Sequence, residues 1–188
     1  MKLNFPVLFF VVSLILPAAC AAEKSIDQPQ FQPPQTEAEK ALDAILTRAK
    51  TDYDMTFYAL NEPHYDPLLG SPHARLVPPE DKGYSRLFTK PLVNAWRELE
   101  KSLVQQSCGG KYIGGELCGL DYNPILCTQD DSDTFHYHTV NSDKNMAIIE
   151  YSPPETEYLL ATYRMIKDQQ GWKIDGVACR DSDKFNMK

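Results

Sequence analysis

The C-terminal stretch over residues 134–180 decides the fold: TFHYHTVNSDKNMAIIEYSPPETEYLLATYRMIKDQQGWKIDGVACR. Its first residues alternate between apolar and polar side chains, which is typical of a strand with one buried face. Turn-forming residues and a Pro-Pro pair separate this segment from three further strand-like runs. Short turns between successive strands favour an antiparallel meander. The predicted strands cover residues 134–140, 146–151, 157–167 and 172–180.

Two amphipathic helices are predicted ahead of these strands. Thr36-Glu37-Ala38-Glu39 matches the capping box that begins a helix. Apolar residues then recur at helical spacing from Leu42 to Leu60, which predicts one long helix with room for a kink near its end. A second apolar stripe runs from Phe88 to Leu103, with Thr89 as the N-cap and Pro91 in the first turn. Helices followed by such strands predict an α+β domain in which the helices cover one face of the sheet.

The N-terminus resembles an export signal. Lys2 precedes an apolar run from Phe5 to Leu16, which is close to the ~7–15 residues of a signal peptide and short of the ~20 of a membrane span. Ala19-Cys20-Ala21 then suits cleavage after Ala21. Alternatively, Cys20 resembles the lipidated cysteine of a bacterial lipoprotein, although Pro17 stands where that motif usually has Leu. Only lipidation at Cys20 would anchor the protein to a membrane.

The rest of the chain reads as one domain with two flanking segments. We expect a signal peptide over 1–21, a flexible proline-rich lead over 22–35, an α+β domain over 36–180 and a tail over 181–188. A hydrophobic content of 43% supports a core and excludes a wholly disordered chain. The net charge of −7 argues against nucleic acid as the main partner, since phosphate binding needs a basic face.

Four cysteines lie within the expected domain: Cys108, Cys118, Cys127 and Cys179. An even number in an exported chain indicates two disulfides, with three arithmetically available pairings. We favour one bond that closes the glycine-rich loop, Cys108–Cys118, and one that ties this region to the C-terminus, Cys127–Cys179. A zinc site is the competing interpretation, although the sequence has no Cys-x-x-Cys pair.

Two segments carry a family resemblance: CGLDYNPILCTQD over 118–130 and GWKIDGV over 171–177. With the leading helices, they resemble the domain-of-unknown-function 3828 family of bacterial envelope proteins. That family is similar to the nuclear-transport-factor-2-like cone, which implies helices packed into a strongly curved antiparallel sheet over Thr36 to Arg180. The resemblance implies no catalytic residues. The wider superfamily contains both enzymes and binding modules, so the fold does not decide the function.

The sheet offers the first set of candidate residues. His136 and His138 are two apart on a predicted strand, so they share a face and can bind a metal or supply a base. Asp130, Asp131 and Asp133 lie just upstream and can complete a metal site. The favoured alternative is a polar strand face wetted by solvent, because the sequence fixes no third ligand.

Asp175 is a second candidate, on the last strand. If it faces the interior of a closed cone, desolvation raises its pKa and makes it a plausible general base. Arg164, on the neighbouring strand, is instead expected to pair with it as part of the structure, and we favour this alternative.

The cysteine-bearing loop contributes Asp121, Tyr122, Gln129 and Asp130. A loop held by disulfides can present a recognition surface, or it can be a packed connector. These four residues and Arg164 are the predicted binding residues.

The sequence therefore predicts an exported, non-enzymatic envelope protein, periplasmic or secreted, that binds a protein partner or a small ligand. An immunity, inhibitor or accessory role suits this profile. No phosphate loop, dinucleotide fingerprint, His-Glu-x-x-His helix or nucleophile elbow is present, and we expect no cofactor. The alternatives are an enzyme whose acid–base groups are Asp175, His136 or His138, a metal-binding module that uses the two histidines, and an outer-membrane lipoprotein.

Overall fold

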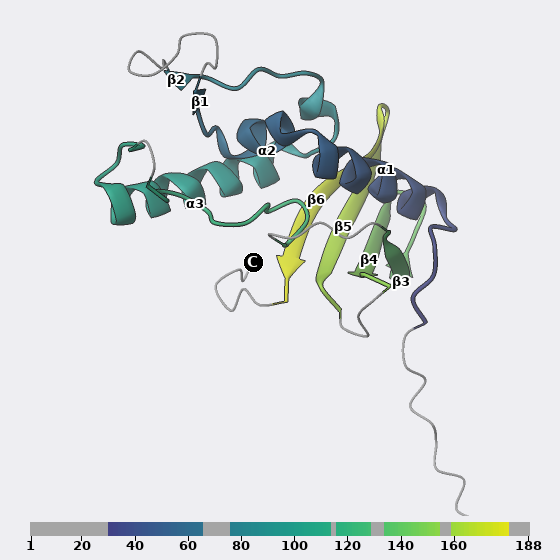
Figure 1. Ribbon diagram of the computed structural model, residues 1–188. Helices are drawn as coiled ribbons and strands as arrows, with labels where there is room; N and C mark the ends of the chain where they lie inside the picture. The colour runs from purple at the N-terminus through teal and green to yellow at the C-terminus, as the bar shows by residue number, and fades with distance from the viewer. Residues whose placement is uncertain (1–29, 66–75, 114–115, 129–133, 155–158, 181–188) are drawn as a thin grey trace, which may run out of the picture.

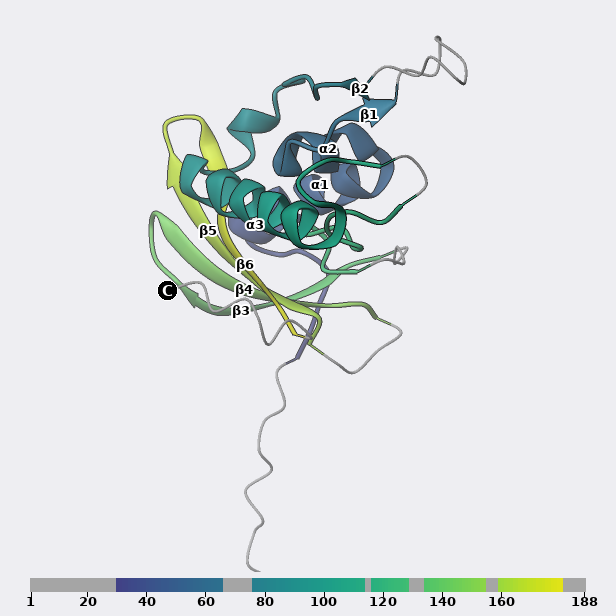
Figure 2. The same ribbon diagram turned by 90° about the vertical axis from the view of Figure 1, so that its left-hand side faces the viewer.

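The computed structural model describes residues 30–65, 76–113, 116–128, 134–154 and 159–180. Three helices precede a four-stranded antiparallel sheet and lie on one side of it (Figure 1). The sheet order β3-β4-β5-β6 pairs each strand with its neighbour in sequence, so it is the predicted meander. The strands bend as they run past the helices (Figure 2). The predicted α+β class is confirmed.

The first predicted helix is in fact two helices, α1 (Glu37–Thr51) and α2 (Tyr53–Leu60). The capping box is present, because the Glu39 amide donates to the Thr36 hydroxyl (3.1 Å) and the Thr36 amide donates to the Glu39 carboxylate (2.9 Å). The break falls at Asp52, where φ is −115° and ψ is 81°. The prediction of one continuous helix was therefore wrong at this residue.

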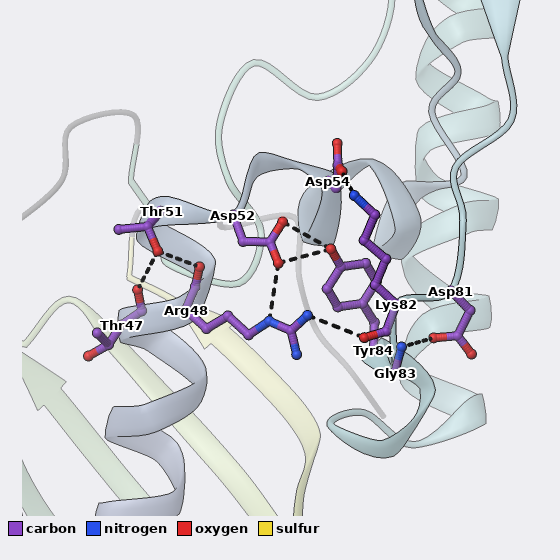
Figure 3. A network of polar contacts seen from close by, with 9 residues as sticks. All are labelled: Thr47, Arg48, Thr51, Asp52, Asp54, Asp81, Lys82, Gly83 and Tyr84. Carbon is purple, nitrogen blue, oxygen red and sulfur yellow. Dashed lines mark hydrogen bonds and ion pairs between the residues drawn. The ribbon is translucent and has the colours of Figure 1, made fainter.

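A polar network explains the break at Asp52 (Figure 3). The Tyr84 hydroxyl donates to the Asp52 carboxylate at 2.9 Å, and Arg48 Nε donates to it at 3.1 Å. Arg48 also reaches the Lys82 carbonyl oxygen, and the Lys82 ammonium pairs with Asp54. Since Tyr84 belongs to the short helix η2 (Tyr84–Arg86), the network fixes a distant segment against the α1–α2 junction and sets the direction of α2.

The third helix, α3 (Lys90–Cys108), begins as predicted with Thr89 as its N-cap and Pro91 in the first turn. The Thr89 side chain makes no capping hydrogen bond, however. Its amide donates instead to the Ile174 carbonyl oxygen of the sheet at 3.0 Å, which joins the start of α3 to the last strand. A two-stranded ribbon, β1 (His64–Tyr65) with β2 (Leu76–Val77), lies between α2 and η2 in the chain.

The sheet strands are β3 (His136–Ser142), β4 (Met146–Ser152), β5 (Ala161–Asp168) and β6 (Gly171–Cys179). The described strand β5 begins at Ala161, and residues 157 and 158 of the predicted strand lie outside the described residues. Bulges interrupt the register between Thr139 and Asn141 and between Arg164 and Met165.

The core lies between the helices and one face of the sheet. Tyrosines dominate the sheet side, and two of their hydroxyls donate hydrogen bonds across the core: Tyr137 to Asp43 of α1 (2.9 Å) and Tyr163 to the Ile125 carbonyl oxygen (2.8 Å). The largest fully buried side chains include Trp96, Tyr84, Tyr137, Tyr151, Tyr163, Phe88, Leu42, Leu46 and Met55.

Two disulfide bonds, Cys108–Cys118 and Cys127–Cys179, match the pairing favoured from the sequence. They hold the segment that follows α3, of which residues 109–113 and 116–128 are described and which we call the stapled loop. It runs back past α3 toward the sheet (Figure 1). Two disulfides fit a chain that folds outside the reducing cytoplasm. Within the described residues, no helix combines the length and the apolar character that crossing a membrane requires.

Candidate functional site

The predicted histidines share one face of the sheet, and that face points away from the helices. Tyr137, which lies between them on β3, is buried and reaches Asp43 of α1. His136 and His138 therefore point to the opposite side, where the ring of His138 meets the edge of Phe31 at a centroid distance of 6.1 Å.

Asp175 does not face the interior of the domain. Arg164 Nε donates to Asp175 Oδ2 at 2.7 Å, and the Arg164 side chain is 54% exposed on the face opposite the buried Tyr163 and Met165. A bulge at this point gives the inward position to Ile174. The favoured interpretation, in which Asp175 pairs with Arg164, is the observed arrangement, and the alternative of a base facing the interior is not.

The histidines and Asp175 do not converge. His138 is on β3 and Asp175 on β6, so three strand spacings, about 14 Å along the sheet, separate them. Among the described residues, no three His, Cys, Asp or Glu side chains are grouped as a metal site would need. Asp130, Asp131 and Asp133 lie outside the described residues.

The predicted binding residues separate into three groups. Asp121 and Tyr122 line a cleft between α2 and the stapled loop. Arg164 is on the open face of the sheet, in its ion pair with Asp175. Gln129 and Asp130 lie outside the described residues. Of the predicted binding residues that the structure describes, Asp121 and Tyr122 belong to a concave surface.

This cleft, which we call the α2 cleft, has a volume of about 380 Å³. Its walls are largely apolar or aromatic, and two of its residues are unusually exposed for their type: Tyr53 at 67% and Leu117 at 66%. They form an apolar rim. The lining residues are Ala49, Tyr53, Thr56, Phe57, Leu60, Glu62, Leu117, Leu120, Asp121, Tyr122, Asn123 and Thr128.

Glu62 is the lining residue with the most altered chemistry. It follows the end of α2, where Asn61 takes the left-handed conformation with φ 58°. Burial, with a further contribution from the nearby Glu100 carboxylate, raises the pKa of Glu62 to about 7. Among the described residues, none forms a hydrogen bond or ion pair with its carboxyl group. Thr56, on the same wall, has a buried hydroxyl oxygen without a hydrogen-bond partner in the described part of the chain.

Glu100 is held firmly by the stapled loop. Its carboxylate is buried on α3 and accepts from the Tyr112 hydroxyl (2.9 Å) and the Leu120 amide (2.8 Å). Gly119 lies against it so closely that a Cβ atom there would stand 1.7 Å from Glu100 Oε1. The negative charge close to Glu62 is therefore fixed in place by backbone and side-chain donors.

A second cleft of about 380 Å³ adjoins the first. This second cleft, which we call the α3 cleft, shares Leu60 with the α2 cleft and is lined along α3 by Glu100, Arg97 and Lys101, and by Tyr112. Burial, together with the carboxylates of Glu100 and Glu62, raises the pKa of Tyr112. The two clefts thus meet at the Glu62–Glu100 pair.

Neither Glu62 nor Glu100 is among the residues predicted from the sequence. The burial of Glu100 was predictable from helical spacing, because this residue lies four residues after Trp96 and four before Val104, on the buried stripe of α3. Glu62 had none, since its burial depends on the stapled loop folding back over α2. Chemically, the arrangement offers a partly buried acid beside apolar walls, which suits a positively charged group with an apolar neighbour.

Comparison of the chain with protein-family models, with curated proteins and with solved structures gives no match.

Proposed function

We propose that the chain is an exported, non-enzymatic protein of the cell envelope or the extracellular space that binds a protein partner through the α2 cleft. Membership of the domain-of-unknown-function 3828 family, with its nuclear-transport-factor-2-like cone, is part of this proposal. An immunity, inhibitor or accessory role would use such a site. A small ligand is the alternative occupant.

One observation carries the proposal. The α2 cleft combines an exposed apolar rim, Tyr53 and Leu117, with a carboxyl group that has no hydrogen-bond or ion-pair partner among the described residues, Glu62. Exposed apolar patches rimmed by polar groups mark interaction sites. Two disulfides hold one wall of the cleft, so this wall is preorganised and loses little conformational entropy on binding.

Export is supported by the signal-like segment over 1–21 and by the two disulfides. A freely secreted or periplasmic protein follows from cleavage after Ala21, and an outer-membrane lipoprotein follows from modification of Cys20. Mass spectrometry of the mature N-terminus distinguishes these outcomes.

Site-specific photo-crosslinking tests the binding function. A photoreactive phenylalanine analogue at Leu117 should give crosslinked protein adducts in cells that express the full chain. Val140 is the matched control, because it is also an exposed apolar residue (52%) but lies on β3, outside the cleft lining. Adducts from position 117 and none from 140 are expected. Equal adducts from both positions, or none from 117, would overturn the proposal.

An enzyme is the second candidate, because a carboxyl group with a pKa near 7 can accept or donate a proton at neutral pH. Acid–base catalysis also requires a substrate whose reacting atoms lie within hydrogen-bond reach of this carboxyl group. Binding needs only the carboxylate and its apolar surroundings, so it accounts for the site with fewer requirements.

A further inference from the structure

We propose that the α2 cleft recognises a lysine or arginine side chain of a polypeptide partner, with the Glu62 carboxylate as its counter-ion and Tyr53, Phe57 and Leu117 contacting the residues beside it. This inference rests on the proposed binding function and specifies the chemistry of the partner.

Charge complementarity is the first argument. Among the described residues, the charged side chains that line the cleft are Glu62 and Asp121, and both are acidic. Asp121 already has an interaction of its own. Glu62 lacks a hydrogen bond or ion pair among the described residues, so a basic group entering the cleft would meet an unneutralised carboxylate. A partly buried carboxylate without a partner is unfavourable, and a cation relieves that cost.

The walls fit the rest of such a side chain. Lys and Arg carry an apolar stem that packs on apolar surface while the charged head reaches a polar group. Tyr53, Phe57 and Tyr122 line the same cleft, and aromatic faces also attract cations. A basic residue with apolar or aromatic neighbours would therefore use both the carboxylate and the walls.

The extent of the surface favours a polypeptide over a small cation. The α2 cleft continues into the α3 cleft past the shared Leu60, and the exposed rim residues Tyr53 and Leu117 extend it outward. A single small cation would occupy the neighbourhood of Glu62 and leave this rim uncovered. An extended segment of several residues would cover the rim, with its basic residue at Glu62 and its other residues toward the α3 cleft, where Arg97 and Lys101 lie.

The groups around Glu62 make recognition dependent on pH. Glu100 of α3 and Tyr112 of the stapled loop interact electrostatically with this carboxyl, and the acidic Asp121 and the aromatic Tyr122 line the same cleft. The basic side chains of Arg97 and Lys101 line the adjoining cleft on α3 and do not contribute to the shift in the pKa of Glu62. These surroundings keep a large part of Glu62 protonated near neutrality, and a bound cation favours the ionised form. Affinity for a basic segment should therefore rise with pH through about 7.

Peptide selection tests the inference. A phage-displayed library of random heptapeptides is panned at pH 8 on the immobilised mature protein and on its Glu62→Gln and Leu117→Asp variants. We expect the wild type to enrich peptides with Lys or Arg next to an aromatic or apolar residue. Glu62→Gln should weaken these peptides at least tenfold, and Leu117→Asp should abolish capture. Circular dichroism verifies that both variants are folded. If Leu117→Asp is unfolded, Leu117→Ser replaces it in the experiment.

The outcomes separate this inference from the proposed function. Selected peptides that depend on Leu117 but carry no basic residue, or whose affinity survives Glu62→Gln, overturn the inference and leave the binding function standing. The absence of any peptide that depends on Leu117 overturns the inference as well, and the crosslinking from position 117 then decides the binding function. For the basic peptides, affinity at least tenfold tighter at pH 8 than at pH 5.5 is expected, with no such change in Glu62→Gln.

Discussion

Two acidic clusters stand at the two ends of α2, and they differ in what neutralises them. At the first end, Asp52 accepts from Arg48 and Tyr84, and Asp54 pairs with Lys82 (Figure 3). At the second end, Glu62 lies close to Glu100, and no described lysine or arginine is paired with either carboxyl group. Acidic residues near one short helix thus occur in a neutralised and an unneutralised form.

This difference separates a structural role from a functional one. A satisfied polar network rigidifies the elements that it joins, and here it fixes the angle between α1 and α2. A partly buried carboxyl with a raised pKa, beside a cleft, is a candidate functional group instead. The first cluster fixes the position of α2. That position places Glu62, in the second cluster, beside the α2 cleft.

The largest predicted effect comes from removing the disulfides that hold the stapled loop, which supports the second cluster. Replacing both Cys127 and Cys179 by serine removes a disulfide whose cysteines are 52 residues apart in sequence. This double change should lower the free energy of unfolding by about 4 kcal/mol. The same change at Cys108 and Cys118, with a separation of 10, should cost about 3 kcal/mol. Urea unfolding of both double variants measures this. A larger loss from the shorter loop would contradict the ordering.

Gly119→Ala tests how firmly Glu100 is held. The added methyl group would lie 1.7 Å from Glu100 Oε1, so the carboxylate or the loop backbone must move. We expect a loss of about 1–3 kcal/mol in the free energy of unfolding, as for other overpacked sites. Denaturant unfolding measures this loss. Gly83→Ala is a partial control, since nothing lies within 4 Å of its added Cβ, although its positive φ adds backbone strain. A neutral Gly119→Ala would show that Glu100 is mobile.

Asp52→Asn should break the first cluster by removing its negative charge. The amide keeps the shape of the side chain but leaves Arg48 without a charged partner and gives Tyr84 a weaker acceptor. We expect a loss of about 1–2 kcal/mol in the free energy of unfolding at pH 7. Glu98→Gln is the control, because its contact with Lys101 is long (4.0 Å) and both side chains are exposed, so its effect should be within 0.5 kcal/mol.

The second cluster should respond in the opposite direction. The pKa of Glu62 in the folded protein is raised to about 7 from an ordinary value of 4.5, so the folded state holds this proton more tightly than the unfolded state. Stability linked to Glu62 is therefore present at low pH and is lost as the pH rises from about 4.5 to 7. Glu62→Gln should stabilise the protein at pH 8, by roughly 1 kcal/mol after allowing for solvent screening.

Thermal unfolding at pH 4.5 and pH 8 measures the effect of Glu62→Gln. The variant should gain stability over the wild type only at the higher pH. Equal stability at both values, or destabilisation at pH 8, would show that Glu62 is either solvated or paired.

Local patterns in the sequence predicted much of the fold. The capping box at Thr36, the proline at the start of α3 and the strand meander all depend on neighbouring residues. The break at Asp52 was not predictable, because Tyr84, which is 32 residues away, supplies its partner. The pairing of Asp175 with Arg164 was favoured from the sequence, but the bulge in the β5–β6 register beside it was not predictable, because it interrupts a strict alternation of faces.

The candidate site was predicted only at one edge. Asp121 and Tyr122 belong to it because the disulfide-held loop presents them, as the cysteines suggested. Glu62 acquires its properties from burial and from Glu100, which α3 brings near it. Such desolvation is a property of the assembled structure and has no local pattern.

The account depends most directly on the ionisation of Glu62. Its side-chain carboxyl carbon can be followed by NMR as a function of pH, in the free protein and with a saturating basic peptide from the selection. We predict a pKa near 7 in the free protein and a decrease of at least one unit in the complex. A carboxyl that titrates near 4.5 in the free protein, or whose pKa is unchanged by the peptide, would contradict the account.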